Sequence, residues 1–115
     1  MNKVSFEGVG AVCATYYAAD GVKGGMVVKL SGDSTVDVCG TGDRFFGVAM
    51  SDADGGCAAV QMDGVAMVSC DASVVTGWTK LIPDGAGGVK LDAANGHEYL
   101  VLSVDTTAKI AAVRL

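Results

Sequence analysis

The chain lacks several features that would point to particular functions. It has eight basic against 13 acidic residues, a formal net charge of −5, and its lysines and arginines form no cluster. Because nucleic-acid binding needs a concentrated basic surface, direct binding to DNA or RNA is not expected. No apolar run approaches the ~18 residues of a membrane span, and Glu7 and Gly8 interrupt any signal-peptide core at the N-terminus. We therefore expect a soluble protein made in the cytoplasm.

Proline and aromatic residues are also scarce. Pro83 is the only proline, and the aromatic residues are one Trp, three Tyr and three Phe, whereas glycine occurs 17 times. Glycine costs about 1 kcal/mol in a helix interior and favours tight turns, so this composition predicts many turns and little helix. Much of the apolar content is Ala and Val, which predicts a thin core. A chain of 115 residues has room for one domain.

Short apolar runs alternate with turn residues along the whole chain, with a spacing of roughly ten residues that is typical of a sandwich or barrel. Asp52–Gly56 and Asp63-Gly64 divide residues 45–70 into three strands, since Asp-Gly suits tight turns. Further strands are expected within 3–17, 26–30, 35–39, 78–82, 89–92, 98–104 and 109–115, with a short helical turn at 71–75. The prediction is an all-β fold, a small closed barrel or sandwich of short antiparallel strands. It forms a single domain over 1–115, with 1–7 as a candidate N-terminal arm.

The sequence also contains a faint internal repeat. AAVQM (58–62) aligns with AAVRL (111–115), VAMSDADGG (48–56) with VLSVDTTAK (101–109), and Gly25-Met26 with Gly77-Trp78. The first pair is offset by 53 residues and the last by 52, so the alignment needs one gap. Either chance similarity in an Ala- and Gly-rich chain or a duplication explains it. A duplication predicts two related halves, each a small meander, that bury one core and are related by a pseudo-two-fold axis.

Few residues have the types and spacing that a chemical site needs. Asp52 and Asp54 partly match a calcium loop, but Gly56 and Asp63 stand where an EF-hand needs a further ligand and a Glu. We therefore interpret Asp52–Gly56 as a hairpin turn. His97 follows an Asn-Gly turn, and a surface position is expected for it. No catalytic residue, metal ligand or cofactor is predicted, and a cysteine-dependent hydrolase is a remote alternative.

The cysteines do not occur in the closely spaced pairs that zinc sites use. Each stands among small apolar residues, which favours four buried, reduced thiols. One or two disulfides, or less readily a four-cysteine zinc site, remain open alternatives. The four residues are Cys13, Cys39, Cys57 and Cys70.

The aromatic residues are the best candidates for contact with another protein. Tyr16-Tyr17 and Phe45-Phe46 are adjacent pairs, and neighbouring residues on a strand point to opposite faces of the sheet. One ring of each pair is therefore expected to face away from the core, where it either contacts a protein or covers an open barrel end. The candidate contact residues are Phe6, Tyr16, Tyr17, Phe45 and Trp78.

Several segments together resemble a family of small phage proteins that decorate, or cement, the capsid and stabilise the head. The most similar pieces are Phe46–Ala49, Val60–Val65 and Val113–Leu115. They lie within a longer pattern that includes GMVVKL, FFGVAMSDADGGCAAVQMDGVAMV and GWTKLIPDGAGGV, so the resemblance covers nearly the whole chain. The four cysteines and the bulky Tyr16-Tyr17 pair depart from the pattern.

The resemblance implies a structural role without enzymatic activity. Such proteins bind the exterior of the expanded head, often as trimers, and hold neighbouring capsomers together. It implies a homotrimer whose partner is the major capsid protein, located on the capsid exterior of the virion after synthesis in the host cytoplasm. The alternative is a β-barrel module that binds a carbohydrate or another ligand, which would need a polar pocket and an aromatic platform near Trp78, Tyr16 or Phe45.

Overall fold

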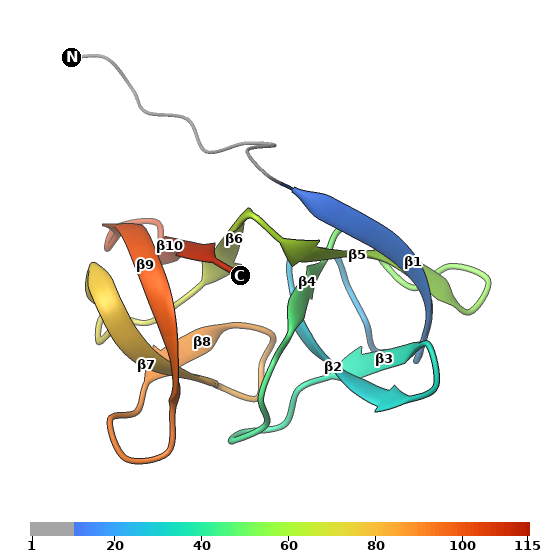
Figure 1. Ribbon diagram of the computed structural model, residues 1–115, viewed down its shortest axis with the longest axis horizontal. Coiled ribbons are helices and arrows are strands. Elements are labelled where there is room, and N and C mark those ends of the chain that lie inside the picture. The colour runs from blue at the N-terminus through green and yellow to red at the C-terminus, as the bar shows by residue number, and fades with distance from the viewer. Residues whose placement is uncertain (1–10) are drawn as a thin grey trace.

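The computed structural model describes residues 11–115, which form ten strands and no helix (Figure 1). The all-β prediction is therefore confirmed, and among these residues no helix could cross a membrane. The expected strand within 3–17 lies partly, and the expected arm 1–7 wholly, outside the described residues. The strands are β1 (Val12–Ala18), β2 (Val27–Gly32), β3 (Thr35–Val38), β4 (Gly47–Ala49), β5 (Cys57–Asp63), β6 (Val65–Ser69), β7 (Gly77–Pro83), β8 (Val89–Leu91), β9 (His97–Asp105) and β10 (Ile110–Arg114).

The strands form two five-stranded sheets that divide the chain into halves. In the first half, β1-β3-β2-β4-β5 form a closed barrel, in which β1 pairs in antiparallel fashion with β5 and in parallel fashion with β3. In the second half the order is β6-β10-β9-β7-β8, and a parallel bridge from Cys70 to Val89 connects its two ends. Figure 1 shows the halves side by side, with β1–β5 on the right and β6–β10 on the left.

The two halves have the same topology. If β1 to β5 are matched in order with β6 to β10, every pairing of the first sheet has its counterpart in the second, with the same strand direction. The register agrees as well, since the parallel pair of Ala18 with Val36 corresponds to Cys70 with Val89. The predicted repeat is thus confirmed, and AAVQM and AAVRL are equivalent strands.

Equivalent positions of the halves also fill their interiors. Besides Val48 and Val101, six buried residues of the first half each have a buried apolar counterpart 52 or 53 positions later in the chain. The change of offset falls between Met26 and Val28, where the repeat needs its single gap. The buried residues form two clusters, so the expectation of one shared core is wrong. One cluster lies in the first half, and the other combines the second half with Val27, Cys39, Phe45 and Val48 of the first. The equivalent pairs are Ala18/Cys70, Val22/Val74, Val28/Leu81, Val36/Val89, Ala58/Ala111 and Val60/Val113.

The connections between strands repeat the same backbone conformations. Gly25 and Gly77 have φ values of 90° and 108°, Ser34 and Gly87 have 51° and 94°, and Gly56 and Lys109 have 80° and 56°. Such left-handed conformations are unfavourable for residues with a side chain, so their recurrence at Ser34 and Lys109 reflects the shared fold rather than local preference.

The halves do not exchange equivalent contacts, as a two-fold axis would require. The turn between β7 and β8 reaches the first half, where the Gly87 carbonyl accepts a hydrogen bond from the Val27 amide at 3.0 Å. The equivalent turn between β2 and β3 lies at the far right of Figure 1, away from the second half. The expected pseudo-two-fold axis is therefore wrong, and the halves follow one another head to tail.

The helical turn expected at 71–75 is absent, and irregular turns take its place. The Asp71 carboxylate accepts hydrogen bonds from the amide and hydroxyl of Ser73. Hydrogen bonds of this kind, from a side chain to nearby residues, compete with helix formation, and here they span only Asp71 to Ser73.

Candidate functional site

Acidic side chains in the turns accept hydrogen bonds from backbone amides. Asp52, in the connection from β4 to β5, accepts a hydrogen bond from the Gly24 amide at 2.8 Å, and Asp63 accepts one from Gly64 at 2.8 Å. Within residues 11–115, no three side chains of His, Cys, Asp or Glu lie close enough to hold a metal ion. Asp52–Gly56 joins the antiparallel strands β4 and β5, as the predicted hairpin turn requires. The half-buried His97 begins β9 opposite Leu81, so it is less exposed than expected.

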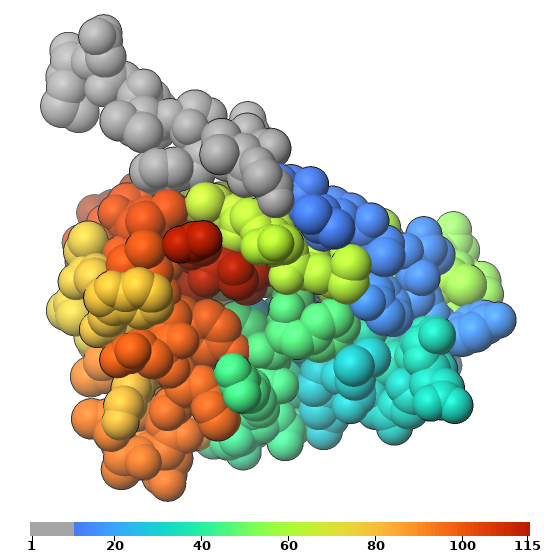
Figure 2. Space-filling model, viewed as in Figure 1, coloured from blue at the N-terminus to red at the C-terminus, as the bar shows by residue number. Residues whose placement is uncertain are grey.

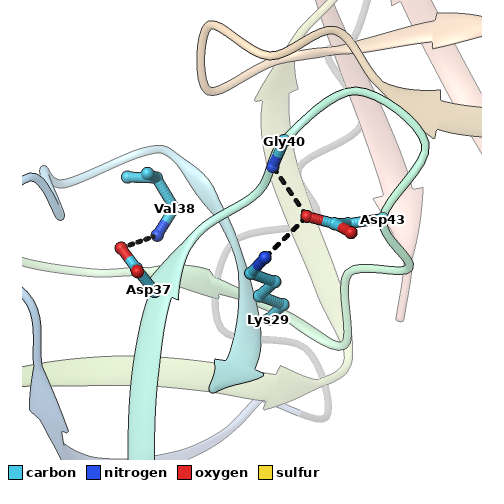
Figure 3. Close-up of polar contacts among 5 residues, drawn as sticks. All are labelled: Lys29, Asp37, Val38, Gly40 and Asp43. Atoms are coloured by element: carbon cyan, nitrogen blue, oxygen red, sulfur yellow. Dashed lines mark hydrogen bonds and ion pairs between the residues drawn. The ribbon is translucent and has the colours of Figure 1, made fainter.

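The Cys39–Phe46 loop, which links β3 to β4, is fixed by an ion pair (Figure 3). The Lys29 ammonium lies 2.8 Å from one carboxylate oxygen of Asp43, which also accepts the Gly40 amide at 2.8 Å. The Lys29 side chain lowers the pKa of Asp43, and the Gly40 hydrogen bond acts in the same direction. The pKa of Lys29 is raised by the same partner. Because the pair is solvent-exposed, it orders the loop more than it stabilises the fold.

Phe45, near the end of this loop, lies between the halves. Its ring is 1% exposed and stacks on Tyr99 of β9, with ring centroids 4.4 Å apart at an angle of 9°. The Tyr99 hydroxyl donates a 2.6 Å hydrogen bond to the Phe45 carbonyl. Burial raises the pKa of Tyr99. Phe45 therefore joins the two halves, and its selection as a surface contact is wrong because its side chain is enclosed by the second core.

An open groove of about 520 Å³ follows the junction of the halves. Its charged side chains are the Lys29–Asp43 ion pair and Arg44, while Leu30, Phe46 and Tyr99 give it apolar surface. A second groove, of about 460 Å³, lies between the end of β4 and β5 and includes Thr15 and Asp54. Neither groove includes Trp78 or Tyr17, so neither has the fully exposed aromatic ring that a sugar platform needs.

The other candidate aromatic residues have different environments. Tyr16 is half-buried, packs edge-on against Phe46 at 5.7 Å, and donates a hydrogen bond to the sulfur of Met62. Tyr17 and Trp78 are 63% and 66% exposed, as a contact residue should be. They belong to strands at opposite ends of the molecule, β1 and β7, so they do not form one patch. Phe6 lies outside the described residues.

Further large apolar side chains are exposed at positions the sequence interpretation did not select. Leu30, which follows the buried Val27 and Val28 on β2, is 57% exposed. Its equivalent in the second half is Pro83, which is buried. Leu30 is therefore identified as an unusual surface residue by comparing the two repeats. The other exposed residues of this kind are Val12, Met50, Met67, Val75, Leu91 and Ile110.

The cysteines are unpaired, and only two of them are buried. Cys39 and Cys70 are in the core, Cys57 is half-buried and Cys13 is exposed on the outer face of β1. The expectation of four buried thiols is thus wrong for Cys13, because β1 alternates and residue 13 points outward. Burial raises the pKa of the Cys39 thiol to about 11, and it also raises that of Cys70.

We expect iodoacetamide at pH 8 to alkylate Cys13 fastest, Cys57 more slowly, and Cys39 and Cys70 only after unfolding. The thiolate is the nucleophile, so a buried thiol with a raised pKa reacts slowly for two reasons. Peptide mass spectrometry over a time course, with a urea-denatured sample as control, measures the order. Labelling of Cys39 in the folded protein as fast as of Cys13 would contradict the structure.

Comparison of the sequence with protein-family models and with curated proteins found no match. The functional interpretation therefore depends on the surface and the junction described above. These offer exposed apolar side chains and shallow grooves.

Proposed function

We propose that this chain is a phage capsid decoration protein, which binds the exterior of an expanded head and stabilises contacts between capsomers. Its partner is the major capsid protein, and it acts as a homo-oligomer on the virion. The resemblance to decoration proteins supports this. So does the position of its segments: Phe46–Ala49 includes β4, Val60–Val65 the β5–β6 turn, and Val113–Leu115 the end of β10.

The observation that carries the proposal is the distribution of apolar side chains on a small acidic protein. Trp78, Tyr17 and Leu30 are each more than half exposed; Trp78 lies on β7, whereas Tyr17 and Leu30 lie on β1 and β2, which flank β3 in the first half. Single exposed apolar side chains are common on soluble proteins, so the support comes from their number: nine large ones are exposed within residues 11–115. A clamp between capsomers needs several contact surfaces, whereas a catalyst needs one convergent polar site.

The fold suits contact through side chains rather than through added strands. The first barrel is closed, and the second sheet has its two ends joined at Cys70 and Val89. Few backbone groups are therefore free to pair with a strand of another protein. A clamp of this kind binds only the assembled state and stabilises it by mass action.

Sedimentation with phage shells tests the proposal. We expect the protein to sediment with expanded shells that lack decoration, in a saturable manner, and to stay in solution with unexpanded shells. Bovine serum albumin at the same concentration controls for trapping in the pellet. Absence of binding to either kind of shell would contradict the proposal.

The second candidate is a ligand-binding module, favoured by the junction groove with Lys29 and Arg44. Asp43 pairs with Lys29, so Arg44 is the side chain that would hold an acidic sugar or another small anion there. An array of acidic glycans tests this function. Binding to an array glycan that is lost in the Arg44→Ala variant supports this function, whereas an array to which the protein does not bind excludes it.

A further inference from the structure

The contact between the two halves is built on the β7–β8 turn. The Gly87 carbonyl accepts the Val27 amide, and the Met26 side chain lies against Gly87, since a Cβ at that position would be 2.7 Å from the Met26 Cγ. Earlier in the turn, a Cβ on Gly85 would be 2.8 Å from the Thr41 hydroxyl. Pro83, at the start of the turn, is buried.

Every part of this contact has an equivalent in the other half. The β2–β3 turn, with Leu30 and Ser34, corresponds to the β7–β8 turn, with Pro83 and Gly87. The receiving surface around Met26 and Thr41 corresponds to Trp78 and Ala94. The repeat therefore provides each half with both a docking turn and a receiving surface.

In one chain only one of these two contacts is made. Pro83 is buried, but the equivalent Leu30 is 57% exposed. Met26 is half-buried beneath the turn, but the equivalent Trp78 is 66% exposed. One docking turn and one receiving surface thus remain uncovered within residues 11–115.

The two unused surfaces lie at opposite ends of the molecule. In Figure 1 the β7–β8 turn points right, toward the first barrel, and the β2–β3 turn points right, away from the protein. The strand β7, which carries Trp78, is on the left, and the space-filling view shows the first half at the other end (Figure 2). Such head-to-tail surfaces form heterologous contacts, in which each copy uses one surface to bind and the other to be bound.

We propose that the β2–β3 turn of one copy docks on the Trp78 surface of a second copy, and so continues the contact that already joins the two halves. Leu30, at the position equivalent to the buried Pro83, covers the indole ring of Trp78, at the position equivalent to Met26. Ser34 has a side chain where Gly87 has none, so the backbones approach less closely here, and the larger Trp78 fills the added space. This inference concerns contact between copies and goes beyond the capsid proposal, because it holds for any partner.

Two variants, Leu30→Glu and Trp78→Glu, test this proposal by light scattering over a range of concentrations. Wild-type protein is expected to form oligomers, and each variant alone to remain monomeric at concentrations at least tenfold higher. A 1:1 mixture is expected to form dimers and nothing larger, because one intact turn meets one intact Trp78 surface. Two variants that do not assemble alone can assemble when mixed only if the contact is heterologous, with a different surface on each copy.

Met67→Glu is the matched control, because Met67 is 54% exposed on β6 and lies outside both surfaces. It should assemble like wild type. Thermal unfolding of all three variants verifies that each is folded, which their exposed positions favour. The proposal is overturned if wild-type protein is monomeric throughout, if either variant assembles like wild type, or if the mixture of folded variants stays monomeric.

Discussion

Phe45→Ala is expected to lower the free energy of unfolding by about 3–5 kcal/mol, as loss of a large core side chain does. The ring is 1% exposed, stacks on Tyr99, and belongs to the core cluster that includes the second half although its loop is in the first. Its loss opens a cavity at the junction that the rigid sheets cannot close. Equilibrium unfolding in urea, followed by tryptophan fluorescence and by circular dichroism, measures the change.

The neighbouring Phe46→Ala is the matched control for this substitution. Phe46 is half-buried and packs on Tyr16 at the edge of the first core, so its removal should cost clearly less. Equal losses for the two variants, or a loss below about 1 kcal/mol for Phe45→Ala, would mean that the junction is not packed as described.

The second large effect is expected at Gly47, the first residue of β4. A Cβ at this position would lie 2.6 Å from the Gln61 carbonyl oxygen and 2.8 Å from a Val60 methyl group. Because the oxygen belongs to the backbone of the paired strand β5, relief needs a shift of the barrel itself. We expect Gly47→Ala to destabilise the protein by at least about 2 kcal/mol, measured by the same urea titration.

Gly21→Ala provides the control for Gly47→Ala. A Cβ at Gly21 would meet only Val38 Cγ1, at 3.8 Å, and its φ is not in the left-handed region. Its stability should be unchanged or raised by up to about 1 kcal/mol, since alanine restricts the unfolded chain. If Gly47→Ala is as stable as Gly21→Ala, β4 and β5 do not approach as closely as described.

Much of the fold could be predicted from local patterns. Alternation in AAVQM and AAVRL, and Asp-Gly turns at Asp63-Gly64, indicate strands and hairpins without knowledge of the tertiary structure. The repeat predicted the equivalence of the halves. It could not predict that the buried residues form two clusters, because each sheet closes through pairings between distant segments, such as β1 with β5.

The surface was less predictable than the strands. Exposure of Tyr17 and Trp78 agrees with the aromatic argument, but the pattern Phe45-Phe46 gave no sign of which ring is enclosed. That is decided by Tyr99, which is 54 residues away in sequence. Likewise Leu30 continues an apolar run and becomes exposed only because its turn extends beyond the barrel. Neither the enclosure of Phe45 nor the exposure of Leu30 can be recognised from the residues next to it in the sequence.

Electron cryomicroscopy of expanded shells incubated with the protein tests the central proposal most directly. We expect additional density at regular positions on the outer surface, between capsomers, into which the two linked five-stranded sheets fit. Unexpanded shells, prepared in parallel, should show bare outer surfaces. Expanded shells that remain bare at saturating protein concentration, or density confined to the shell interior, would contradict the proposed function.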